Sequence, residues 1–140
     1  AYLTREFFEL LHERLRDRTV LVAAFRDGDM VAGALNLIGS DTLYGRNWGT
    51  IDRTPLLHFE TCYYQAIDIA IERGLKTVEA GAQGEHKIQR GYEPVLTHSA
   101  HLIADEGLRN AVARFLDQER NHIAQDREFI MAEHSPFRQE

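Results

Sequence analysis

The chain has 140 residues, of which 44% are hydrophobic and 27% are charged, and its formal net charge at pH 7 is −6. These values are typical of one globular domain and argue against a dedicated nucleic-acid-binding protein, which normally carries a basic face. No apolar run approaches the ~18 residues of a membrane span. The single cysteine, Cys62, excludes an internal disulfide framework and fits a reducing compartment, so we expect a cytoplasmic protein with an inert, buried thiol.

The first 50 residues predict a helix followed by a three-stranded meander. Thr4 is a candidate cap for a helix that runs to about Asp17. Its apolar face consists of Leu3, Phe7, Leu10, Leu11 and Leu15. Residues 19–26 form a β-branched, apolar run, and Asp27-Gly28 then predicts a tight hairpin turn into a second strand over residues 30–39. A third strand is expected over residues 41–48.

The strongest helix pattern covers residues 54–74. Thr54 suits the N-cap, Pro55 suits the first helical position, and Gly74 predicts a left-handed stop over which Leu75 can pack. The expected buried stripe comprises Leu56, Phe59, Tyr63, Ile67, Ala70 and Ile71.

Two more strands and a long helix complete the expected order. The strands are predicted over residues 76–80 and 95–104, and the helix begins at Asp105 or Glu106 and extends to about His122 or beyond. A helix between strands permits a parallel crossover, so the sequence predicts one α+β domain over residues 1–140 with a mixed central sheet flanked by helices.

Residues 76–94 are the segment in which we expect the chemistry. Ionisable and amide side chains lie between glycines directly after a strand, and glycine allows a ligand to approach the backbone closely. The residues concerned are Glu79, Gly81, Gln83, Glu85, His86, Lys87 and Arg90.

Three motifs carry a resemblance to a known family. They are YGRNWG at residues 44–49, Phe59-Glu60 near the start of the helix, and GEHK at residues 84–87. With these motifs the chain resembles the FemAB-like proteins of peptidoglycan (peptidogalycan) biosynthesis, within the GNAT acyltransferase superfamily. Family members are longer and usually have two GNAT-like halves. This chain resembles the C-terminal half, so we expect it to be part of a longer protein whose N-terminal half is its partner.

The resemblance implies a fold and a reaction. In the GNAT fold two parallel strands splay apart, here expected at residues 41–48 and 76–80, and main-chain groups in the wedge hold the acyl donor. An amine of a small molecule or peptide attacks the donor carbonyl, a base takes its proton, and strand N–H groups polarise the carbonyl. The donor is acyl-CoA or aminoacyl-tRNA; tRNA is the one nucleic acid we expect as a partner. The loop GTIDRTPL at residues 49–56 lacks the Gly-rich turn that holds pyrophosphate in acetyl-CoA enzymes.

Site roles follow from the residue types, each beside a plainer alternative. Glu79 and Glu60 are candidate bases or amine anchors, but Glu79 also fits an ion pair with Arg46 or Lys87, and a helix dipole alone explains Glu60. His86 is a third candidate catalytic group, because histidine titrates near neutrality.

The binding candidates are Arg46, Trp48, Gly81, Gln83, Glu85, Lys87, Arg90 and His101. Lys87 and Arg90 suit an anionic group. Trp48 suits a cleft wall or, equally well, the core. The segment at residues 85–87 also fits an exposed charged turn.

Three functions therefore stay open. The main expectation is an N-acyltransferase of FemAB-like type that acts in cell-wall peptide biosynthesis. The alternative is a non-catalytic half that binds ligand or packs against its partner. A metal-dependent hydrolase using Glu85 and His86 is disfavoured, because no second ligand cluster has suitable spacing, so we expect no metal site.

Overall fold

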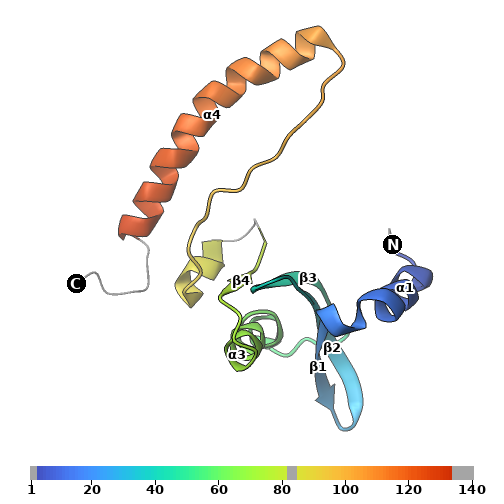
Figure 1. Cartoon of the computed structure of the whole chain (residues 1–140). Helices are drawn as coiled ribbons and strands as arrows, with labels where there is room; N and C mark the ends of the chain where they lie inside the picture. Colours follow the sequence, from blue (N-terminus) through green and yellow to red (C-terminus); the bar gives the residue numbers. More distant parts are fainter. Residues whose placement is uncertain (1–2, 82–84, 134–140) are drawn as a thin grey trace. The chain divides into compact units, whose positions relative to one another are not determined.

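The structure is a computed structural model that describes residues 3–81 and 85–133, with residues 85 and 86 described in their backbone only. The chain divides into two compact units, Ala1–Ala82 and Gln83–Glu140. Figure 1 labels the elements of both units.

The first unit holds a four-stranded mixed sheet in the order β1-β2-β3-β4. It begins with α1 (Arg5–Leu15) and the short η1 (Arg16–Arg18), and its strands are β1 (Thr19–Arg26), β2 (Asp29–Ile38), β3 (Thr42–Thr50) and β4 (Thr77–Glu79). The first two strand pairs are antiparallel, and β3 and β4 are parallel. The predicted α+β class with a mixed sheet is confirmed.

The hairpin between β1 and β2 turns where the sequence predicts. Asp27 has φ +53° and Gly28 has φ +93°. Two consecutive residues with positive φ match the right-handed twist of the strands, which is why Asp-Gly is favoured here.

The helix after β3 begins differently from the prediction. Leu56, not Thr54, stands at the N-cap position with φ +65°, and the helix comprises α2 (Leu57–Phe59), a π-helical turn η2 (Glu60–Tyr64) and α3 (Gln65–Glu72). Leu56 stands before the helix in a left-handed conformation and is 69% exposed, and Ile71, which follows the wider turn, is 72% exposed; neither is buried as expected. The buried positions are Thr61, Tyr63, Ala66 and Ala70.

The end of this helix follows the prediction. Gly74 has φ +66°, its N–H donates to Ile71 O at 3.1 Å, and Leu75 N–H donates to Ala70 O at 2.9 Å. Leu75 then packs against the core. Glycine is favoured here because the left-handed conformation strains a residue with a Cβ.

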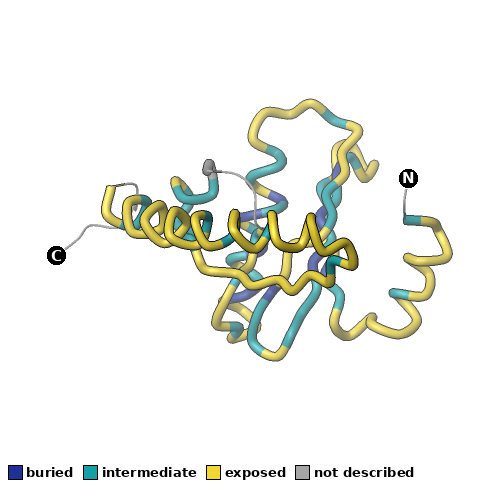
Figure 2. The backbone as a smooth tube through the Cα atoms, turned by 90° about the horizontal axis from the view of Figure 1, so that it is seen from above, coloured by how far each residue is buried: buried dark blue, intermediate teal, exposed yellow. Residues whose placement is uncertain are grey.

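The core lies between the sheet and α3. Val20, Leu43 and Ala66 form its centre, and the partly buried Val22, Ile38, Ile69, Leu75 and Val78 pack against them. In Figure 2 the buried residues lie on the strands and on the helix after β3. By contrast, no residue of α1 is buried, and Thr4 at its N-cap position makes no side-chain capping bond, contrary to the expected cap.

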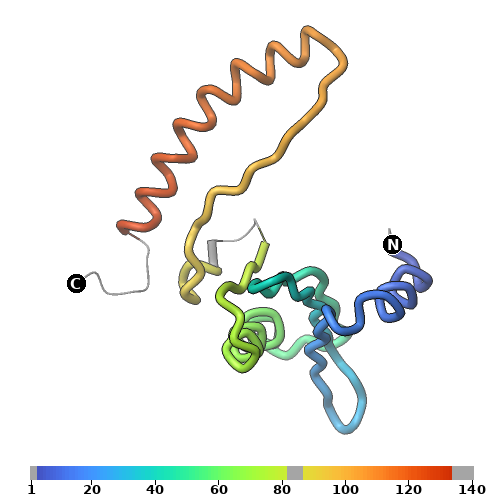
Figure 3. Tube along the Cα trace, viewed as in Figure 1, coloured from blue at the N-terminus to red at the C-terminus, as the bar shows by residue number. Residues whose placement is uncertain are grey.

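The second unit contains η3 (Glu85–Arg90) and the long α4 (Glu106–Glu133). The strand expected over residues 95–104 is wrong: the described residues 92–105 form neither helix nor strand (Figure 3). The described part of the second unit contains no strand with which this alternating pattern could pair, and Leu102 is fully exposed. α4 begins as predicted, with Asp105 Oδ1 accepting from Leu108 N–H at 2.7 Å, and it continues beyond His122 to Glu133, as the sequence allowed.

Candidate functional site

The two strands expected to lie side by side do so over three residue pairs. β3 and β4 pair at Thr42/Thr77, Leu43/Val78 and Tyr44/Glu79. β4 then ends, whereas β3 continues to Thr50. Beyond Tyr44, the edge of β3 that faces β4 therefore has no strand partner within the described part of the chain.

A β-bulge changes the face of the sheet on which the side chains of the continuing part of β3 lie. Leu35 pairs with Asn47 and Asn36 pairs with Gly45, so Arg46 is an extra residue without a partner on β2. A bulge interrupts the alternation of faces. As a result Gly45 and Trp48 lie opposite Asn36 and Ala34, two residues of the buried face of β2.

A pocket with a volume of about 130 Å³ opens at this point. β2 and β3 form one side, the helix after β3 forms another, and Ala80 after β4 closes part of the rim. Its lining residues are Leu35, Asn36, Gly45, Arg46, Asn47, Trp48, His58, Cys62, Tyr63 and Ala80. All of them belong to the first unit.

Aromatic rings form the wall of the pocket on its helical side. The ring centroid of His58 lies 5.2 Å from that of Trp48 and 5.4 Å from that of Tyr63. Phe59 also packs beside His58 at 5.6 Å. Cys62 and Tyr63, which belong to the π-helical turn, line the pocket together with His58. The irregular geometry of the helix at this turn therefore contributes to the site.

The polar interior of the pocket comes from two asparagines. Asn36 is 1% exposed, and its Nδ2 donates to Ala34 O at 3.2 Å. A Cβ on Gly45 would lie 3.8 Å from Asn36 Oδ1, so this oxygen points across β3 towards a position without a side chain. Asn47 Oδ1 is buried and has no hydrogen-bond partner in the described structure.

Cys62 lies at the pocket as a neutral thiol. Burial raises its pKa, and a hydrogen bond from Thr61 only partly offsets that effect. A thiol with a raised pKa is a weak nucleophile at neutral pH, which supports the interpretation of Cys62 as an inert side chain.

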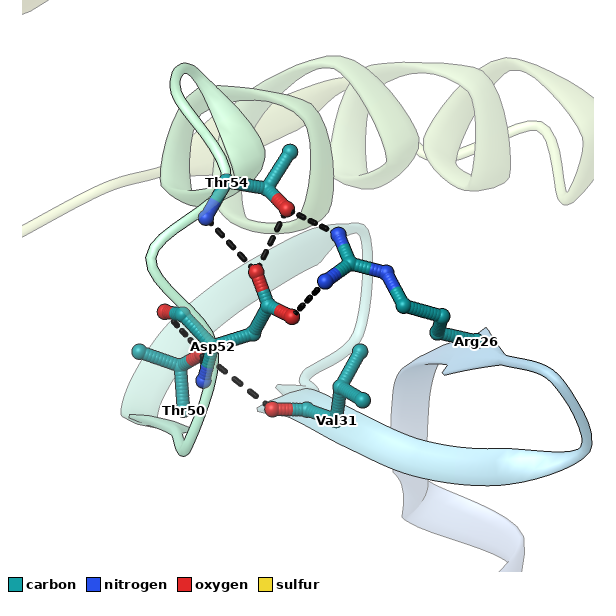
Figure 4. Close-up of polar contacts among 5 residues, drawn as sticks. All are labelled: Arg26, Val31, Thr50, Asp52 and Thr54. Carbon is teal, nitrogen blue, oxygen red and sulfur yellow. Dashed lines mark hydrogen bonds and ion pairs between the residues drawn. The ribbon is translucent and has the colours of Figure 1, made fainter.

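The loop between β3 and the helix is fixed by a small polar cluster, which we call the Asp52 cluster: Arg26, Thr50, Asp52 and Thr54 (Figure 4). Asp52 forms an ion pair with Arg26 and accepts from Thr54 N–H at 2.6 Å. The Thr54 hydroxyl also contacts both Arg26 and Asp52. The Thr54 bonds are the main cause of the lowered pKa of Asp52, and Arg26 adds to it.

The predicted site residues of the first unit fall into two groups. Arg46 and Trp48 line the pocket. Glu79 is exposed and follows Val78, a core residue, so alternation places it on the opposite face of the sheet. Glu60 is exposed and its Oε1 accepts from Gln65 Nε2 at 2.8 Å. Neither carboxylate lines the pocket, and no ion pair joins Glu79 to Arg46, both of which are described.

The other predicted residues follow β4. Gly81 has φ +79°, and Lys87 and Arg90 belong to η3, where burial lowers the pKa of Lys87. His101 is exposed, with its Nε2 2.9 Å from Ser99 Oγ. Gln83 lies outside the described residues, as do the side chains of Glu85 and His86.

The sequence interpretation missed Asn36, His58 and the pocket role of Tyr63. His58 directly precedes the Phe59-Glu60 motif, so its position beside a family motif was a usable signal. Among the described residues, no three His, Cys, Asp or Glu side chains are grouped as a metal ion would require. No described helix has both the length and the apolar character to cross a membrane.

Comparison with known proteins gives one match. A family model named FemAB_like, described as peptidogalycan (peptidoglycan) biosynthesis/recognition, matches residues 1–139. Searches of the curated proteins and of the solved structures gave no significant match. The family model covers nearly every residue, and the chain therefore belongs to the FemAB-like family of peptidoglycan biosynthesis/recognition proteins.

Proposed function

We propose that this chain is the acyl-transferring part of a cytoplasmic FemAB-like enzyme that moves an acyl or aminoacyl group to an amine during cell-wall peptide biosynthesis. The family match supports the biosynthetic setting. The observation that carries the transferase assignment is the edge of β3 that runs on beyond the end of β4, beside the pocket. A GNAT-type transferase uses such a divergence of parallel strands to hold its donor.

The proposed reaction uses the unpaired edge of β3 and the aromatic wall. The donor carbonyl lies along β3 beyond Tyr44, where backbone N–H groups stabilise the negative charge that develops on its oxygen. The amine nitrogen attacks the carbonyl carbon and loses a proton to a base. The bond to the leaving group, a thiolate or a tRNA hydroxyl oxygen, then breaks to give the amide.

His58 is the base that the geometry favours. It lines the pocket between Trp48 and Tyr63, and imidazole titrates near neutral pH. Glu79 stays a second candidate, since its backbone adjoins Gly45 although its side chain lies on the other face. We assign His58 first because a base must reach the reacting nitrogen.

The donor that fits the loop at residues 49–56 is an aminoacyl ester rather than acyl-CoA. A bound diphosphate at that loop would meet the Asp52 carboxylate, and Arg26 and Thr54 already bond to it. Like charges at close range disfavour binding. Of the two donors, aminoacyl-tRNA is therefore the one we propose.

A second function keeps support from one observation. Glu60 and Glu79, the two carboxylates expected to act on the amine, both lie away from the pocket. A FemAB-like half that only binds ligand, or packs against its partner half, accounts for that placement without requiring a base.

Transfer assays with aminoacyl-tRNA and with acyl-CoA, each with a primary amine acceptor, separate these functions. We expect turnover with aminoacyl-tRNA and a loss of about 10²–10⁴-fold in His58→Gln, the usual contribution of a positioned base. His12→Gln, an exposed histidine of α1, is the matched control and should keep full activity. Equal activity in His58→Gln with loss in Glu79→Gln would move the role of base to Glu79. No turnover with either donor would favour the binding function.

A further inference from the structure

We propose that Asn36 determines specificity in this pocket: its side-chain oxygen accepts a hydrogen bond from the N–H of a small primary amine. This inference rests on the proposed function, because it assigns the pocket to the amine acceptor of that reaction. The amine enters beside Gly45 and packs against the ring of Trp48.

Burial of Asn36 is the first step of the argument. The carboxamide of Asn36 is 1% exposed and lies between Ala34 and Ile38 on a strand face that is otherwise apolar. Burying such a group lowers the stability of the fold unless its polar atoms form hydrogen bonds. Its Nδ2 has a partner in Ala34 O. Its Oδ1 has no donor among the residues that the structure describes.

The direction of the free oxygen is the second step. Because Nδ2 bonds to Ala34 O, the orientation of the amide is fixed and Oδ1 is turned towards Gly45. Gly45 has no side chain there, so the pocket reaches this oxygen. Asn47 Oδ1 is a second buried acceptor without a partner at the same pocket. Two carboxamide oxygens that have no donor among the described residues favour a ligand that donates.

Charge and size define the ligand further. The described lining of the pocket contains no carboxylate, so from the described residues a bound ammonium gains its attraction through carboxamide oxygens and the face of Trp48. A carboxamide does not hold the positive charge as a carboxylate would, which leaves the amine free to lose its proton to His58. The volume of about 130 Å³ is close to that of the ~150 Å³ cavity that holds benzene. It takes an aminoalkyl end and not a whole peptide.

The chain carries two reporters of this site. Trp48 is its single tryptophan and Cys62 its single cysteine, and both line the pocket. Tryptophan emission and the rate of Cys62 alkylation therefore respond to occupancy without any label and without turnover.

The test titrates the 140-residue chain with ethylammonium, tetramethylammonium and propionate. Ethylammonium should change Trp48 emission saturably and slow Cys62 alkylation. Tetramethylammonium has the charge without an N–H, and propionate has the opposite charge. Both should bind at least about tenfold more weakly, the equivalent of one lost hydrogen bond.

Variants assign the effect to Asn36. Asn36→Leu should lose the preference for ethylammonium, whereas the same change at an exposed position of α4, Asn121→Leu, should keep it. Gly45→Ala is a second variant, since its methyl group would stand 3.8 Å from Asn36 Oδ1 and obstruct the ligand while meeting only ordinary contacts. Equal responses to all three probes in the parent chain, or an unchanged preference in folded Asn36→Leu, would overturn the proposal.

These outcomes separate the inference from the proposed function. Selective ethylammonium binding without any acyl transfer would leave the amine site standing and remove the transferase assignment. Acyl transfer to amines with no response at Trp48 or Cys62 would remove the amine site and leave the transferase assignment.

Discussion

At the scale of one residue, Gly74 and Gly49 allow the effect of an added Cβ on the free energy of unfolding to be compared in two backbone conformations. Gly74 has φ +66° and Gly49 has no positive φ, and a Cβ would meet nothing within 4 Å at either position. Gly74→Ala should therefore lower the free energy of unfolding by about 1 kcal/mol through backbone strain alone. Gly49→Ala should be neutral or slightly stabilising. Urea unfolding measures both, and equal effects would contradict the left-handed helix stop.

Cys62 gives a second prediction at this scale. Because burial raises the pKa of its thiol, alkylation by iodoacetamide at pH 7.5 should be at least several-fold slower than that of a peptide thiol, whose pKa is about 8.5. The rate should rise with pH past that value and reach the peptide rate in denaturant. A native rate above that of the peptide would mean an activated thiolate and would reopen a nucleophilic role.

The motifs located Arg46 and Trp48 from sequence, but not the residues that complete the pocket. Asn36 precedes the YGRNWG motif and lies on β2, a strand whose other inward residues are apolar, so its sequence context predicts only core packing. Only the pairing of Asn36 with Gly45 across the bulge shows that this asparagine faces a space. A bulge depends on the register between two strands, and single-sequence alternation contains no such register.

At the scale of the elements, the Asp52 cluster should make the loop before α2 sensitive to acid. The folded-state pKa of Asp52 is lowered, so its contribution to stability is fully present above the unfolded pKa of about 3.9 and is lost as pH falls through the folded value. Asp52→Asn should lower the melting temperature at pH 7, and the gap to the parent chain should close as pH falls below about 4.

The control for this effect is Asp17→Asn, an aspartate whose side chain is 96% exposed. An exposed substitution of this kind changes stability by no more than about 0.5 kcal/mol. A pH-independent gap between the parent chain and Asp52→Asn would mean that the loss comes from packing and not from the charge of the carboxylate.

Elements fixed by local chemistry could be predicted from the sequence, whereas those fixed by neighbours could not. The Asp27-Gly28 turn and the Gly74 stop need only the conformational freedom of their own residues, and both are where the sequence places them. Leu56 at φ +65° is different, because a branched side chain gives no signal for a left-handed conformation. Residues 95–104 show the reverse error, since alternation suggested a strand, whereas the described part of their own unit contains no strand that could pair with them.

At the scale of the molecule, the pocket and the core both belong to the first unit. The central residues Val20, Leu43 and Ala66 precede Gln83, and so does every described residue that lines the pocket. A chain that ends at Ala82 should therefore unfold cooperatively and keep the emission of Trp48 and the slow alkylation of Cys62. Thermal unfolding followed by circular dichroism tests this, with the 140-residue chain as the control. A truncated chain without a cooperative transition would show that the first unit depends on residues 83–140.

The sequence motifs led to the family, and family membership is confirmed over residues 1–139. The placement of the site was predictable only in part. The expected parallel pairing of residues 41–48 with residues 76–80 is present, but the Gly-rich segment after β4 lies in the second unit or at its border. Sequence proximity to a strand end indicated that segment, and the three-dimensional pocket draws instead on β2 and on the helix after β3.

The central claim is that the reacting group binds where β3 continues alone beyond β4. Gly45→Ala tests it most directly, because the added Cβ would meet Glu79 O at 3.5 Å and Asn36 Oδ1 at 3.8 Å, contacts that a folded strand accommodates. Steady-state transfer of an aminoacyl group to a primary amine is measured for Gly45→Ala and for the control Gly49→Ala. We predict unchanged unfolding in both and a loss of transfer in Gly45→Ala alone. Full transfer activity in folded Gly45→Ala would contradict the account.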